Sequence, residues 1–222
     1  MTVMEAPGDD SDSVSLADRA YVVIRDKLIT LDIRPSEAIV ESALASELRC
    51  GRTPVREALK RLEADRLAVS FPRRGTFATG VNVADLGHIS QVRVSLEPVA
   101  ARAAAEEASP EVRHHLEILA ERTERLDLSA LSQQELMRWD LNVHRTIYRA
   151  TGNPHLEDVL IRFNNLATRI FCLFLTRLPT FGSHVGEHTE LLRSIALGDG
   201  DAAAGIARDH VTGFEEAVRA LL

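Results

Sequence analysis

The stretch RTPVREALKRLEADRLAVSFPRRGTFA, residues 52–78, decides the fold of the first part of this chain. Thr53 and Pro54 predict a helix start, because a hydroxyl can cap free amides and proline suits a first turn. Apolar residues follow at helical spacing, namely Val55, Ala58, Leu59 and Leu62. Strand-like runs at 69–71 and 76–78 flank Gly75, which can take the positive φ of a tight hairpin. The stretch therefore predicts a helix followed by a β-hairpin.

Two helical patterns precede this stretch. Ser15 and Asp18 have the form of a capping box, and the apolar spacing behind them predicts a helix over 16–32. After a break at Pro35, the run 44–48 predicts a short second helix, and 49–52 reads as a turn. Three short helices with a tight turn between the last two, and a hairpin after them, predict a winged helix-turn-helix domain over 16–80.

Basic charge is concentrated in this predicted domain. Residues 16–80 hold 12 Lys or Arg against 9 Asp or Glu, whereas residues 81–222 hold 14 against 20, in a chain of net charge −7. A basic domain in an acidic chain favours a local contact with a polyanion such as double-stranded DNA. The alternative is a charged helix face that only meets solvent. The candidate DNA-binding residues are Arg49, Arg52, Thr53, Arg56, Arg73, Arg74 and Gly75.

The second part of the chain, residues 81–222, shows only helical patterns. They predict helices over 84–107, 110–126, 131–150, 156–177 and 183–197, and a sixth from the break at 198–200 to the C-terminus. The expected architecture is a mainly α protein with an antiparallel six-helix bundle behind the winged helix. Residues 1–15 are acidic and polar, and predict a disordered tail.

Four potential metal ligands occupy apolar positions of three predicted helices. Asp140 and His144 are four residues apart and share a face, and His188 and His210 lie within the apolar stripes of two later helices. A divalent cation would satisfy all four together, and three nitrogens with one carboxylate suit zinc or nickel, with manganese or iron as alternatives. The alternative for each histidine is a core imidazole bonded to a carbonyl. His184 lies one turn before His188 and could compete as a ligand.

An arginine that should face the interior suggests that the ligand is a small carboxylate effector. Arg93 shares a face with apolar residues, so its guanidinium should lean inward and fork onto an organic acid. The alternative is an ordinary helical pair with Glu97, four residues on. Asn165 and Arg169 are weaker effector-binding candidates, because they fall opposite the strongest apolar stripe of their helix.

Both halves resemble one known family. The motifs LAxxL at 44–48, RTPVREALxxLE at 52–63 and PRRGTF at 72–77 resemble the N-terminal domain of GntR-family bacterial transcriptional regulators. The motifs RxxxE at 93–97, DxxxH at 140–144, GNPxL at 152–156 and EHxxLLxxIxxGD at 187–199, with the late His210, resemble the FCD effector domain of the FadR subfamily. Six helices resemble its VanR-like branch. The resemblance implies a homodimer on a palindromic operator, with a metal held by the Asp and three His beside a carboxylate effector.

Other features exclude several classes of protein. Cys50 and Cys172 fall in different predicted domains, so a disulfide framework is not expected. The chain lacks 18 consecutive apolar residues and a signal-peptide pattern at its start, so we expect a cytoplasmic protein without a membrane partner. The leading hypothesis is a ligand-responsive transcriptional regulator, a repressor in particular, and not an enzyme. A metalloenzyme acting on a small acid and a purely structural metal staple are the alternatives.

Overall fold

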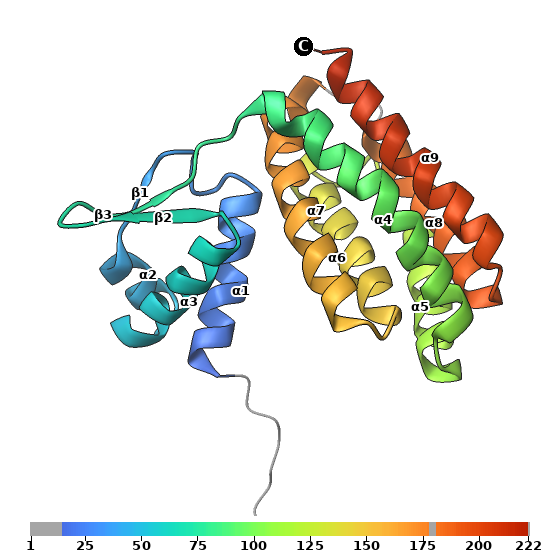
Figure 1. Cartoon of the computed structure of the whole chain (residues 1–222), viewed down its shortest axis with the longest axis horizontal. Coiled ribbons are helices and arrows are strands. Elements are labelled where there is room, and N and C mark those ends of the chain that lie inside the picture. The colour runs from blue at the N-terminus through green and yellow to red at the C-terminus, as the bar shows by residue number, and fades with distance from the viewer. Residues whose placement is uncertain (1–14, 178–180, 222) are drawn as a thin grey trace, which may run out of the picture. The chain divides into compact units, whose positions relative to one another are not determined.

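The computed structural model describes residues 15–177 and 181–221. The described residues form two compact units, one with residues 15–28 and 36–79, the other with residues 29–35, 80–177 and 181–221 (Figure 1). The predicted tail, 1–15, lies outside the described residues except for Ser15.

The first unit is a winged helix-turn-helix, as predicted. It contains α1 (Leu16–Ile29), α2 (Glu41–Glu47), α3 (Arg52–Ala64), β2 (Ala68–Phe71) and β3 (Gly75–Ala78). Helix α1 ends at Ile29 instead of 32, because Leu31 has a left-handed backbone with φ 62°. A strand that the sequence pattern did not predict, β1 (Ala38–Ile39), pairs with the outer edge of β3 and gives the antiparallel order β1-β3-β2.

The start of α3 differs from the prediction. The residue before the helix is Gly51, with φ −75° and ψ 171°, and no side chain caps the helix. The preceding turn has Arg49 at φ 52°, so the chain enters helical conformation at Arg52. Thr53 is therefore inside the first turn, and its predicted role as the cap is wrong, because a capping residue needs non-helical backbone.

The second unit is a bundle of six α-helices among the described residues, as predicted. After the short 3₁₀ helix η1 (Val83–Asp85) they are α4 (Leu86–Glu107), α5 (Pro110–Glu124), α6 (Gln133–Ala150), α7 (Pro154–Phe174), α8 (Phe181–Leu197) and α9 (Gly200–Arg219). A second 3₁₀ helix, η2 (Leu175–Arg177), follows α7. Polar side chains fix several starts: Ser132 and Glu135 form a capping box at α6, and Asn153 caps α7.

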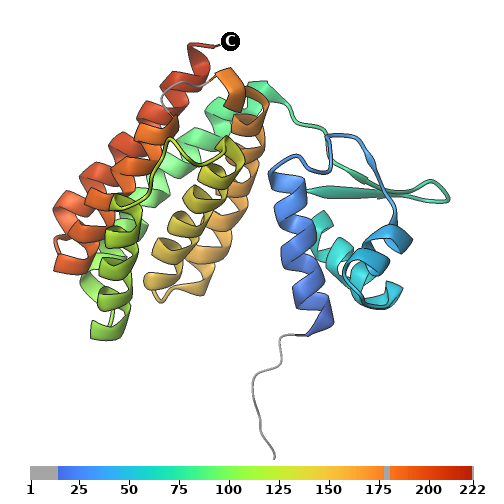
Figure 2. The ribbon, with the colours of Figure 1, turned by 180° about the vertical axis from the view of Figure 1, so that it is seen from behind.

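Helix α4 has several neighbours in the bundle. It packs against α6, α7, α8 and α9, and α5 packs against α8 (Figures 1 and 2). The segment Pro154–Arg177 is long and apolar enough to cross a membrane by length and composition. It packs against α4 and α6, and it buries Asn165 and Arg169, so it reads as a core helix of the bundle.

The bundle core consists of two apolar clusters. Along α6, Met137 belongs to one cluster and Ile147 to the other. The same change of cluster occurs along α8, between Val185 and Leu191, and along α9, between Ala207 and Phe214. The residues between these pairs on the three helices include all four predicted metal ligands. A polar layer therefore interrupts the apolar core at the same level on three helices.

Candidate metal centre and nucleic-acid interface

The four predicted metal ligands converge. Asp140 and His144 of α6, His188 of α8 and His210 of α9 each offer one ligand atom, and these atoms all lie within 4.8 Å of one another. The Nε2 atoms of His144 and His188 are 3.4 Å apart, and Asp140 Oδ1 lies 3.8 Å and 3.7 Å from them. Three helices thus bring three nitrogens and one carboxylate oxygen to a common point.

This cluster fits a divalent cation. All four side chains are buried, with His188 wholly inaccessible. Asp140 Oδ1 and His210 Nε2 are buried atoms without a hydrogen-bond partner. Leaving such atoms unsatisfied costs free energy that a bound cation would offset. A donor set of three imidazoles and a carboxylate is one that zinc, nickel, manganese and iron accept.

Outer carboxylates orient two of the imidazoles. His144 Nδ1 lies 3.3 Å from Glu97 Oε2 on α4 and 3.2 Å from the Tyr148 hydroxyl. His210 Nδ1 lies 3.0 Å from Glu187 Oε2 on α8. A ring that donates its Nδ1 hydrogen to a carboxylate directs the lone pair of Nε2 toward the cluster, as in many metal sites. The sequence reasoning did not assign this role to Glu97 or Glu187, although both stand in motifs beside the ligands.

Burial favours the neutral form of His188 and His210. It lowers the pKa of His210 to about 4, and it lowers the pKa of His188 well below the usual value. The hydrogen bonds from His184 and His210 lower the pKa of Glu187 to about 2. The neutral imidazole is the form that binds a metal, so His188 and His210 are in the ligand state at neutral pH.

The predicted effector residues are also buried. Arg93 forms a 2.6 Å ion pair from Nε to Glu97 Oε1, and both side chains are almost inaccessible. Asn165 and Arg169 are each 2% exposed, although both fall opposite the strongest apolar stripe of their helix. Helix α7 packs against both α4 and α6. Desolvation lowers the pKa of Arg169 to about 10, so it remains charged at neutral pH.

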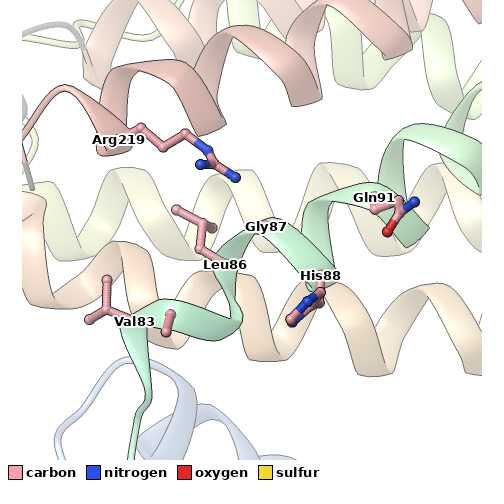
Figure 3. Close-up of a pocket in the computed structure, with 7 residues that line it drawn as sticks. Val83, Leu86, Gly87, His88, Gln91 and Arg219 are labelled. Carbon is pink, nitrogen blue, oxygen red and sulfur yellow. The ribbon is translucent and has the colours of Figure 1, made fainter.

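A wider hollow lies elsewhere on the bundle. It measures 450 Å³ and is lined by Val83, Ala84, Leu86, Gly87, His88, Gln91 and Arg219. The Arg219 guanidinium lies over Gly87 (Figure 3), where a Cβ would meet its Nη2 at 2.6 Å. Arg219 is already bonded to Glu215 at 2.7 Å, and the hollow lacks the buried polar side chains of the metal cluster.

The predicted DNA-binding residues lie on the surface of the first unit. All seven are exposed, in the turn before α3, in the first turns of α3 and at the tip of the hairpin. Gly75 has φ 94°, the positive value that the hairpin requires. Arg56 Nε forms a 2.7 Å ion pair with Glu41 of α2, so a base contact by Arg56 would have to replace this exposed pair. The exposed start of α3 is the part of a recognition helix that meets base edges.

Comparisons with known proteins agree with this architecture. Residues 16–78 match the family described as bacterial regulatory proteins, gntR family, and residues 88–213 match the FCD domain. An uncharacterized HTH-type transcriptional regulator of Bacillus subtilis, YdhC, is 28% identical over 88% of this chain and 78% of its own. The Escherichia coli HTH-type transcriptional repressor GlaR is 24% identical over 86% of this chain and 90% of its own.

Two further similarities complete the comparison. An uncharacterized HTH-type regulator of Agrobacterium vitis is 31% identical over 64% of this chain and 85% of its own. The solved structure of E. coli McbR/YncC has the same fold, with a TM-score of 0.79 at 19% identity, covering 94% of this chain and 99% of that one. The relatives from Bacillus, Escherichia and Agrobacterium whose sequences match are named as HTH-type transcriptional regulators. The winged helix, the bundle and both family matches place this chain in the GntR family of bacterial transcriptional regulators, with an FCD effector domain.

Proposed function

We propose that this regulator is a cytoplasmic homodimer that represses transcription from a palindromic operator and responds to a small carboxylate through a metal in its FCD domain. The observation that carries the proposal is the buried convergence of Asp140, His144, His188 and His210. A cation held there would supply a Lewis acid that attracts a carboxylate oxygen. Repression is supported by the similarity to GlaR, which is named as a transcriptional repressor.

The protein side of effector recognition involves buried cationic groups. Arg93 holds Glu97, and Glu97 in turn accepts from His144, so an acid bound at the cluster would meet a preorganised charge network. Arg169 and Asn165 on α7 supply a further buried cation and amide. We propose Arg93, Asn165 and Arg169 as the residues that orient the effector. Effector binding would change the relative arrangement of the two winged helix-turn-helix domains of a dimer. The expected coupling free energy between effector binding and DNA binding is roughly 1 to 3 kcal/mol.

The exposed arginines predict two kinds of DNA contact. Arg52→Ala removes a donor at the start of α3 and is expected to cost about 1–3 kcal/mol of binding to the operator. The double change Arg73→Ala and Arg74→Ala at the hairpin tip is expected to weaken specific and random DNA alike, and to reduce the salt slope by about 2. Fluorescence anisotropy on both DNAs at several salt concentrations measures this. Arg122→Ala on α5 is the charge-matched control, and equal losses from all three variants would contradict the proposal.

Effector and metal are tested together by thermal shift. A panel of sugar acids, hydroxy acids, dicarboxylates and amino acids is added to metal-loaded and metal-free protein. An effector at 100 times its Kd should stabilise the loaded form by about 2.7 kcal/mol and leave the metal-free form unchanged. Equal stabilisation of both forms would mean that the effector binds without the help of the metal. A metal that stabilises the protein while no acid does would favour the structural staple.

A further inference from the structure

A narrow opening lies beside the metal cluster, between α8 and α9. It measures about 170 Å³, and the residues that line it include His184, Glu187, Asp209, Gly213 and Phe214. Glu187 and Asp209 are exposed acids, and none of the described residues that line the opening is Lys or Arg. An acidic rim raises the local concentration of cations and repels anions. The opening therefore suits the passage of a divalent cation better than that of an organic acid.

The imidazole of His184 separates this opening from the cluster. His184 Nδ1 lies 3.4 Å from Oε2 of Glu187, whose side chain is half exposed. At the other end of the ring, Nε2 lies 3.8 Å from Oδ1 of Asp140, whose side chain is buried in the cluster. His184 itself is 8% exposed. One ring thus reaches from a carboxylate at the surface to a carboxylate of the buried cluster.

Two rings of α9 hold His184 in place. His210 and His184 stack with ring centroids 3.9 Å apart and planes 12° apart. Phe214 and His184 stack at 4.0 Å and 18°. Two rings at such distances would overlap if they lay on the same face of His184, so the imidazole lies between them. The parallel planes also prevent the lone pairs of His184 and His210 from meeting on one ion, so His184 is not a further ligand.

We infer that His184 is a gate, whose ring closes the route by which a divalent cation enters and leaves the cluster. This inference rests on the proposed metal centre. His188 is wholly inaccessible, and His210 Nε2 is a buried atom, so a cation reaches these donors only when a side chain moves. Displacement of His184 would connect the opening with Asp140. That displacement breaks both stacks, and such a conformational step slows the exchange of a bound group.

A gate changes rates and leaves the equilibrium alone. The ring makes the same stacks before and after the cation binds, so its removal should raise the association and dissociation rate constants by one factor. His184→Ala should exchange the cation about 5- to 150-fold faster, the rate equivalent of two lost aromatic stacks, with an unchanged Kd. His184→Phe keeps a flat ring without a nitrogen donor, so it should retain the rates and the Kd of the wild-type protein.

A second variant narrows the opening instead of widening it. Gly213 lines the opening, and nothing lies within 4 Å of the position that its Cβ would take. Gly213→Leu should partly fill the opening without displacing a ligand, and so should lower both rate constants. Gly205 is also an exposed glycine of α9 with nothing within 4 Å of its Cβ position, and it does not line the opening. Gly205→Leu adds the same side chain to the same helix, so it is the matched control.

Stopped-flow absorbance of the full-length protein with Co²⁺ measures these rates. Mixing metal-free protein with Co²⁺ gives association, mixing loaded protein with excess chelator gives dissociation, and a competition titration gives the Kd. Wild-type rates in His184→Ala, a His184→Phe variant as fast as His184→Ala, or equal slowing by both leucine variants would overturn the gate. Weaker binding in both His184 variants would overturn it too, in favour of a direct bond to the metal. Failure of the wild-type protein to bind Co²⁺ would overturn the metal centre itself.

Discussion

Asp140→Ala and His188→Ala should each abolish stoichiometric binding of a divalent metal while the helical circular dichroism signal persists. Each change removes a buried donor from a cluster whose ligand atoms lie within 4.8 Å of one another. Loss of an outer partner already costs about 10- to 100-fold in affinity, so loss of a donor should cost more than 100-fold. Metal analysis after gel filtration and a competition titration measure this, with His155→Ala as the exposed control.

The metal-free protein supplies a second comparison. Asp140 Oδ1 is buried without a hydrogen-bond partner, so the neutral, isosteric Asp140→Asn should not lower the free energy of unfolding in the presence of a chelator. A carboxylate that served the fold alone would give the opposite result, a loss of about 1–3 kcal/mol on neutralisation. Unchanged metal stoichiometry in Asp140→Ala and His188→Ala would reject the ligand assignment, whatever the stability of the variants.

The helices of the bundle could be read from the sequence because their apolar spacing is regular. The helix predicted over 131–150 is observed as Gln133–Ala150, and the helix predicted over 110–126 is observed as Pro110–Glu124. The convergence of the metal cluster could be anticipated for a similar reason. Inward positions of facing helices project into one shared interior. Asp140, His188 and His210, each at such a position, were therefore expected to meet.

Features that depend on tertiary contacts could not be predicted. Strand β1 has two residues, Ala38 and Ile39, and it exists because β3 offers an edge to pair with. The burial of Asn165 and Arg169 was missed for a related reason. Spacing identifies the most apolar face of a helix, but α7 packs against two neighbours, and a second neighbour can bury a polar face. The role of Glu187 depends on the nearness of α9 to α8, which sequence spacing does not specify.

The two interpretations of Arg93 made from the sequence are compatible. Its Nε is bonded to Glu97 four residues on, as an ordinary helical pair would be, yet the pair is buried instead of lying at the surface. Burial alone would raise the pKa of Glu97, but its contacts with Arg93 and His144 together outweigh burial, and the pKa lies well below its usual value. Glu97 is therefore ionised and can accept from His144. The pair is part of the metal site as well as a candidate contact for an effector.

Breaking this pair should have a large effect on stability. Arg93→Met leaves a buried carboxylate beside His144, and Glu97→Met leaves a buried guanidinium, so each should lower the free energy of unfolding by about 3–5 kcal/mol. The double variant removes both charges and should be more stable than either single variant. Urea unfolding with a chelator present measures the three values without contribution from a metal. Costs that simply add would show that the two charges do not depend on each other.

Metal affinity separates the two residues further. Glu97→Gln removes the charge that accepts from His144 Nδ1 at 3.3 Å, so it should weaken metal binding about 10- to 100-fold. Arg93→Lys keeps a cation beside Glu97 but removes the planar fork, so it should leave metal affinity nearly unchanged while weakening a carboxylate effector. Calorimetry with the metal alone, and then with the acid found by thermal shift, measures both. Equal losses of metal affinity in the two variants would mean that the ion pair acts as one structural unit, and that Arg93 has no separate contact with the effector.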